Sequence, residues 1–227
     1  MPSPFNPSLV KFLRALAKNN NREWFTAHKA QYEEEVQQPA LAFIEAMAPR
    51  LRKISKHVRA DARKAGGSLM RIYRDTRFSR EKTPYKTNVG IQFRHEEGKD
   101  VHAPGFYFHI EPGSYFLGAG MWHPEREALN GIRDAIDANG KAWVAARDDR
   151  KFTKGWTLEG DSLRRAPAGY PVDHPLIEDL RRTDFIAVQE LDEKDLYSPK
   201  LADNVAAAYA DTVPFMKFLC GAVDVKF

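Results

Sequence analysis

The sequence predicts an α+β fold, in which an N-terminal helical layer packs on a mainly antiparallel sheet and further helices follow the central hairpin. Two observations predict it. Apolar residues recur at three- and four-residue spacing as far as Arg63, which is the period of an amphipathic helix. From Asn88 to Met121 the period changes to two, as in half-buried strands. No repeat or linker interrupts the 227 residues, so we expect a single domain over residues 1–227.

The N-terminal helices are predicted from apolar stripes and capping residues. The first stripe consists of Leu9, Phe12, Leu13 and Leu16. Asn21 can cap a second helix, in which Trp24 and His28 are neighbours, and we interpret His28 as a core histidine. A third helix is predicted over 39–63. Its outer face would be basic, with Arg52, Lys56, Arg59 and Arg63.

The clearest strand signal is a hairpin, with strands at 106–111 and 114–121 joined by a Pro-Gly turn. Alternation assigns one face to the core, namely Phe106, Phe108, Ile110, Tyr115, Leu117 and Ala119. The other face then carries His109 and Glu111 two residues apart, beside Tyr107. Gly118 and Gly120 on that face are predicted to leave room for a ligand.

Beyond the hairpin the pattern is mostly helical. We predict an irregular stretch at 148–170 with a small hairpin near Gly160, and a strand at 185–189. Helices are predicted from Pro124, around Trp143, over 175–182, and from Ser198 to the C-terminal region with a bend at Pro214.

The segment Arg71–Asn88 combines six cations with two carboxylates and three aromatic side chains. We predict a short strand over Leu69–Tyr73, an ordered loop held by the aromatic residues, and a second strand from Asn88. Guanidinium donors suit carboxylate and phosphate groups, so the loop predicts a site for an anionic small molecule. Its candidate ligand-binding residues are Arg71, Arg74, Arg77, Lys82, Tyr85 and Lys86, together with Tyr107.

The same segment resembles the signature of a known family. The motif R-x-x-R-D-x-R-F followed by K-x-P-Y-K is similar to that of bacterial proteins in the domain-of-unknown-function family 2461. The motifs N-N-x-R-E-W-F, F-Y-F-H-I-E-P-G and A-P-x-G-Y also look like that family. Glu81 stands where the family signature has Asp or Asn. The resemblance implies no particular reaction, cofactor or partner.

Charge is distributed unevenly. Residues 50–86 hold 13 basic and 3 acidic residues, within a net charge of +4 for the chain. The resulting field favours an anionic partner. Two functions stay open: a small-molecule enzyme or binding protein with a basic cleft, or a non-enzymatic module that docks an acidic partner or nucleic acid. The arginines could equally form a structural ion-pair network with Asp75, Glu81 and Glu111.

The candidate catalytic residues are His109, Glu111 and Asp75, which could transfer protons. No H-E-x-x-H, nucleophile elbow, P-loop or dinucleotide fingerprint is present, and we predict no metal and no cofactor. His109, Glu111 and His123 could converge on a metal, but the spacing does not require it. Nucleic-acid binding is not expected, because no aromatic residue alternates with the cations of the predicted basic helix.

The sequence shows no signal-peptide pattern and no apolar run of the roughly 20 residues that a membrane-spanning helix needs. The one cysteine, Cys220, suits a reducing compartment. We therefore expect a cytoplasmic protein that does not bind membranes. The ligand and the oligomeric state are left open.

Overall fold

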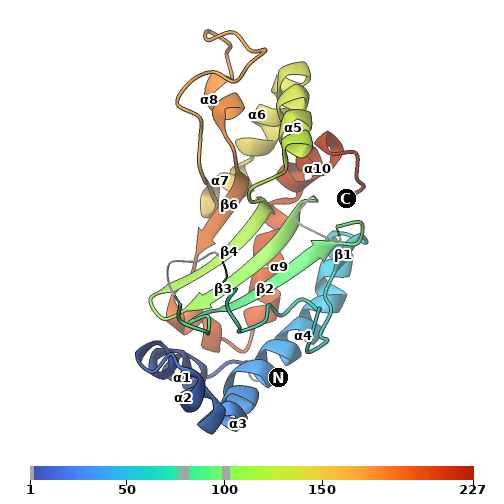
Figure 1. Cartoon of the computed structure of the whole chain (residues 1–227). Coiled ribbons are helices and arrows are strands. Elements are labelled where there is room, and N and C mark those ends of the chain that lie inside the picture. Colours follow the sequence, from blue (N-terminus) through green and yellow to red (C-terminus); the bar gives the residue numbers. More distant parts are fainter. Residues whose placement is uncertain (1–2, 76, 78–81, 99–102) are drawn as a thin grey trace.

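The computed structural model describes residues 3–75, 77, 82–98 and 103–227. Its named strands form a six-stranded antiparallel sheet in the order β1-β2-β3-β4-β6-β5 (Figure 1). The strands are β1 (Val58–Arg59), β2 (Val89–His95), β3 (Gly105–Glu111), β4 (Ser114–Met121), β5 (Thr157–Glu159) and β6 (Phe185–Glu190). With helices before and after this sheet, the α+β prediction is confirmed.

The helices lie at both ends of the sheet and behind it (Figure 1). One end carries α1 (Pro7–Lys18), α2 (Arg22–Ala27) and α3 (Lys29–Tyr32). A π-helical turn (Glu33–Gln37) then leads into α4 (Gln38–Ile54), which packs on α9 (Leu201–Asp211), the helix behind the sheet. The other end carries α5 (Arg126–Ala138), α6 (Gly140–Arg147), α8 (Ile177–Arg181) and α10 (Val213–Ala222).

The central hairpin has the predicted phase. Phe106, Phe108 and Ile110 of β3 are fully buried, and Phe108 pairs with Leu117 across the hairpin. Phe106 also stacks on Tyr209 of α9, with ring centroids 4.4 Å apart. The core therefore lies between the sheet and α9. Tyr107, His109 and Glu111 occupy the opposite, half-buried face, over which no helix of the described residues lies (Figure 1).

The N-terminal layer forms around two capping asparagines. The side chain of Asn6 accepts a hydrogen bond from the Ser8 N–H, and Asn21 accepts one from the Trp24 N–H. The predicted second helix is divided at His28, which ends α2. The His28 ring stacks on Trp24 at 4.0 Å, and its Nδ1 lies 2.8 Å from the Trp24 carbonyl oxygen. These contacts satisfy the ring locally, as predicted, but His28 is half-buried at the end of α2 and does not belong to the core.

The helix predicted over 39–63 is too long. α4 ends at Ile54, Ser55 is extended with φ −147° and ψ 137°, and Val58–Arg59 pairs with β2 as an edge strand. Helical spacing continues past Ser55 by chance, but pairing with the free edge of β2 gives the backbone a different set of hydrogen bonds. The predicted basic helical face does not form, because Lys56, Arg59 and Arg63 lie beyond the helix.

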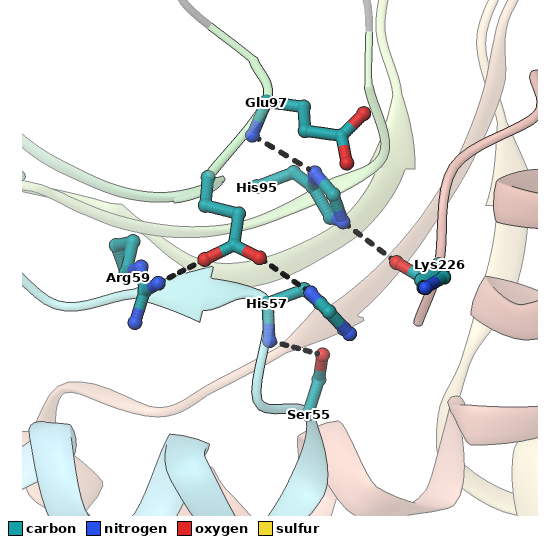
Figure 2. Close-up of polar contacts among 7 residues, drawn as sticks. Ser55, His57, Arg59, His95, Glu97 and Lys226 are labelled. Carbon is teal, nitrogen blue, oxygen red and sulfur yellow. Dashed lines mark hydrogen bonds and ion pairs between the residues drawn. The ribbon is translucent and has the colours of Figure 1, made fainter.

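Figure 2 shows how this edge is held. Glu96 contacts both Arg59 and His57, and the Glu96 Oε1 atom lies 2.5 Å from the His57 Nδ1 atom. His95 is buried and accepts a hydrogen bond from the Glu97 N–H at Nδ1, so its Nε2–H donates to the Lys226 carbonyl at 2.6 Å. These contacts fasten β1 and the C-terminal segment to the end of β2.

The later chain departs from the prediction in three places. A short helix, α7 (Arg150–Gly155), lies in the stretch predicted to be irregular, with Asp149 as its cap. β5 pairs with β6 rather than forming a local hairpin at Gly160. The last predicted helix is divided at Thr212 into α9 and α10, and a 3-10 turn (Glu193–Tyr197) precedes it. Every helix in the described ranges is too short or too polar to cross a bilayer.

Candidate functional site

The described parts of the signature segment, 69–75 and 82–88, pair with each other, and its first residues pair with the edge of β2. Leu69 bridges to Ile91 and Tyr73 bridges to Tyr85, both antiparallel, so the predicted strand at 69–73 consists of isolated bridges. The Lys86 N–H donates to the Ile72 carbonyl at 2.7 Å, which closes the base of the loop. Five residues of the segment, Thr76 and the run 78–81 that includes Phe78, Arg80 and Glu81, lie outside the described residues.

Tyr85 anchors the loop rather than facing the open surface. It is 4% exposed and stacks on Phe25 of α2 at 4.1 Å. The side-chain amide of Asn20 donates to the Tyr85 carbonyl at 2.9 Å and accepts from the Tyr85 N–H at 3.1 Å. Sequence reasoning did not select Asn20, whose role depends on a contact between residues 65 positions apart.

Beyond this anchor the loop opens into a hollow of about 450 Å³, which we call the signature hollow. It lies where the loop meets the end of β3, and it is lined by Arg74, Asp75, Lys86, Thr87, Asn88 and Glu111. The Thr87 hydroxyl donates to Glu111 Oε1 at 2.7 Å. Four of these residues were predicted as site residues. Thr87 and Asn88 were not predicted, because nothing in their local sequence shows that Thr87 contacts Glu111 and Asn88 lies beside His109.

Lys86 is a partly buried cation in the lining of this hollow. Its ammonium is half-buried, and burial lowers the pKa of Lys86, with the charge of nearby Arg71 lowering it further. Within the described part of the chain its side chain has no hydrogen bond or ion pair. Arg74 lies on the same wall and donates from its guanidinium to the Thr83 hydroxyl at 2.9 Å.

Asp75 and Arg77 form a surface pair. The Arg77 guanidinium donates to Asp75 Oδ2 at 2.7 Å, and this contact lowers the pKa of Asp75 to about 2. Asp75 is therefore ionised at neutral pH and can act only as an acceptor. The Arg77 side chain is 77% exposed and does not line the hollow. Lys82 is also exposed and lies outside the lining, and Arg71 reaches the site through its charge on Lys86.

A relay of polar side chains runs along the open face of β3 to the hollow. The Tyr107 hydroxyl lies 3.0 Å from His109 Nδ1, and His109 Nε2 lies 3.4 Å from Glu111 Oε2. A carboxylate only accepts, so Nε2 carries the proton and the Tyr107 hydroxyl donates to Nδ1. Burial lowers the pKa of His109 more than Glu111 raises it, and burial raises the pKa of Tyr107 to about 12. A neutral His109, stacked on Phe116, thus orients Glu111.

The two glycines of β4 do not leave room for a ligand. A Cβ at Gly118 would lie 3.3 Å from the Tyr107 Cβ, so this space already holds the Tyr107 side chain. Gly120 has φ +118°, and a Cβ there would collide with the Phe185 carbonyl oxygen. Both glycines permit close packing within the protein, and the predicted open patch on β4 is wrong.

His123 does not join His109 and Glu111. It follows the far end of β4, where its Nδ1 lies 2.9 Å from the buried carboxylate of Asp184. No group of three or more His, Cys, Asp or Glu residues suited to a metal occurs among the described residues. The chemistry of the signature hollow is therefore that of two cations, two carboxylates and neutral hydrogen-bonding groups.

The fold and the hollow together define an α+β protein in which described residues of the signature segment line a hollow with Glu111, at the end of β3. Comparison with known families identifies it further. The family model described as Conserved hypothetical protein (DUF2461) matches residues 8–218, and the chain belongs to this family. The resemblance predicted from the signature is confirmed. The search of curated proteins and the search of solved structures each found no match.

Proposed function

We propose that the chain binds a small molecule with a phosphate or carboxylate group in the signature hollow. The observation that carries this proposal is the half-buried ammonium of Lys86. It has no acidic partner among the described residues and stands near a second cation, Arg71. A partly desolvated charge beside a like charge is unfavourable, and a bound anion would offset both costs.

The arrangement around Lys86 supports a specific orientation of the ligand. Arg74 and Lys86 supply donors for an anionic group, while Glu111 supplies an acceptor a short distance along the same hollow. His109 and Thr87 hold the two oxygens of Glu111. The chemistry that this geometry would provide in an enzyme is proton transfer to and from Glu111, with His109 as its positioning residue.

A basic docking surface for nucleic acid or an acidic protein has less support. That alternative depended partly on a basic helical face, and the helix ends at Ile54. Arg59 contacts Glu96, and Arg63 pairs with Asp61 at 2.5 Å, so these cations have acidic partners of their own. The cytoplasmic location stays a prediction that rests on the sequence, including its single cysteine.

Thermal melting in different anions tests the proposal. Phosphate and citrate are compared with chloride at matched ionic strength for the wild type, Lys86→Met and Lys64→Met. Lys64 is an exposed lysine outside the hollow and serves as the matched control. At 100 times Kd a ligand stabilises the native state by about 2.7 kcal/mol, or a rise of about 5 °C or more for a chain of this size.

We expect an anion-specific rise in the wild type and in Lys64→Met, and its loss in Lys86→Met. Two results would overturn the proposal. One is an equal response of the wild type to all three anions. The other is a full phosphate response that survives in Lys86→Met.

A further inference from the structure

A second hollow adjoins the signature hollow. It has a volume of about 290 Å³ and is lined by Arg14, Ala17, Lys18, Thr87, Glu111 and Pro112. We call it the α1 hollow, because three of these residues belong to α1. Thr87 and Glu111 line both hollows, so the two lie side by side, and we call them together the groove.

Cations line both ends of this groove. Arg14 and Lys18 stand at the α1 end. Arg74 and Lys86 stand at the signature end, together with the carboxylate of Asp75, whose partner is Arg77. Between them lies the carboxylate of Glu111, which is 38% exposed and so is open to a ligand. Lys18 is exposed and has no ion pair with any described residue. Arg14 is held by Glu193 at 2.9 Å.

This order of charges restricts what the groove can accept. A continuous polyanion would place negative charge against Glu111, where like charges repel. A single small anion would occupy one end only. A molecule with an anionic group at each end would meet cations twice, and a hydroxyl group in its middle could donate to the Glu111 carboxylate.

We infer that the groove binds an elongated small molecule with two anionic ends and an uncharged, hydroxyl-bearing middle. This inference rests on the proposed function of the signature hollow and adds the second anchor at α1. When two binding groups are joined by a linker of matching length, the second contact is intramolecular and the affinity rises without new types of contact.

Isothermal titration with a series of phosphate esters tests the inference. The probes are methyl phosphate and the bisphosphates of straight-chain α,ω-diols with about two to eight carbons, all at matched ionic strength. We expect one spacer length to bind at least about tenfold more tightly than methyl phosphate. Shorter and longer spacers should bind less tightly than this optimum.

Two lysines of α1 provide the matched variants. Lys18→Met removes a cation from the groove, whereas Lys11→Met removes one from the same helix outside it. We expect Lys18→Met to reduce the advantage of the best bisphosphate to about twofold, the statistical value for two equal groups, with methyl phosphate unchanged. Lys11→Met should keep the full advantage. Melting of each free variant checks that α1 stays folded.

The outcomes separate the two proposals. If methyl phosphate binds in a Lys86-dependent manner but no bisphosphate binds more tightly, the two-ended ligand is wrong and the signature hollow stands. The same holds if the advantage survives in Lys18→Met. If neither methyl phosphate nor any bisphosphate binds, both proposals are wrong.

Discussion

The basic segment 50–86 contains two regions of similar composition and different structure. In the first, Arg50 pairs with Asp203, Arg59 with Glu96 and Arg63 with Asp61. In the second, Lys86 is half-buried beside Arg71 without a carboxylate partner among the described residues. This difference in pairing shows that an excess of cations along the chain does not by itself locate an anion-binding site. In our proposal, the site is instead marked by Lys86, a cation that the fold partly desolvates and that has no acidic partner among the described residues.

The largest expected effect is a difference in stability between variants of two tyrosines of the signature loop, the buried Tyr85 and the exposed Tyr73. Tyr85 is buried against Phe25, so Tyr85→Ala should destabilise the protein by roughly 3–5 kcal/mol, as large aromatic truncations in a core do. Tyr73 is 53% exposed, and Tyr73→Ala should change stability by less than about 1 kcal/mol. Urea denaturation measures both. Equal losses would mean that the loop is not held by Tyr85.

The second effect is a pH dependence of stability from His109. Burial lowers its folded pKa below the unfolded value of 6.5, so protons bind preferentially to the unfolded chain. The stability that comes from keeping His109 neutral is fully present above about pH 6.5. It is lost as the pH falls below that value towards the folded pKa. His109→Gln should make the decline between about pH 6.5 and 5 less steep. A parallel decline in wild type and variant would contradict the prediction.

A smaller effect directly tests Lys86, which has no acidic partner in the part of the chain that the structure describes. Without a ligand, Lys86→Met should raise the free energy of unfolding by a few tenths of a kcal/mol, because it removes a partly desolvated charge that water still screens in part. The matched change in the paired region, Arg63→Met, should give no increase, since Arg63 has Asp61 as a partner. A loss of stability in Lys86→Met would show that its ammonium has a structural partner.

The smallest effect concerns the exposed ion pair between Asp75, which lines the hollow, and Arg77. Asp75→Asn should leave the melting temperature at pH 7 nearly unchanged, because both partners are solvated. The depressed pKa of Asp75, about 2, means that its small contribution is present above its unfolded value of 3.8 and disappears as the pH falls through about 2. A clear loss of stability at pH 7 would indicate that Asp75 supports the loop.

Local periodicity predicted much of the fold. The hairpin phase followed from alternation because residues such as Phe108 and Tyr107 must face opposite sides of a sheet. The end of α4 could not be predicted in this way, since Val58 leaves the helical pattern only because the edge of β2 is available for pairing. The glycines of β4 failed for the same reason: the atoms that fill their space come from other strands.

The residues of the candidate hollow could be predicted in part. Composition selected the signature cations, and Arg74, Lys86, Asp75 and Glu111 do line one hollow. Composition could not show that Lys86 lines the hollow and Arg77 does not, because the two cations differ in burial and not in sequence context. Nor could it place Lys18, because α1 and the signature loop are far apart in the chain and meet only in the folded protein.

The contact of Asn20 with Tyr85 has a geometric consequence for the groove. Asn20 follows Lys18 by two positions, and Tyr85 precedes Lys86 directly. A single amide therefore joins the backbone near the two cations at opposite ends, with hydrogen bonds of 2.9 and 3.1 Å. If the proposed two-ended ligand binds, this one side chain, which lines neither hollow, helps to set the distance between the anchoring charges and so the length of molecule that reaches both.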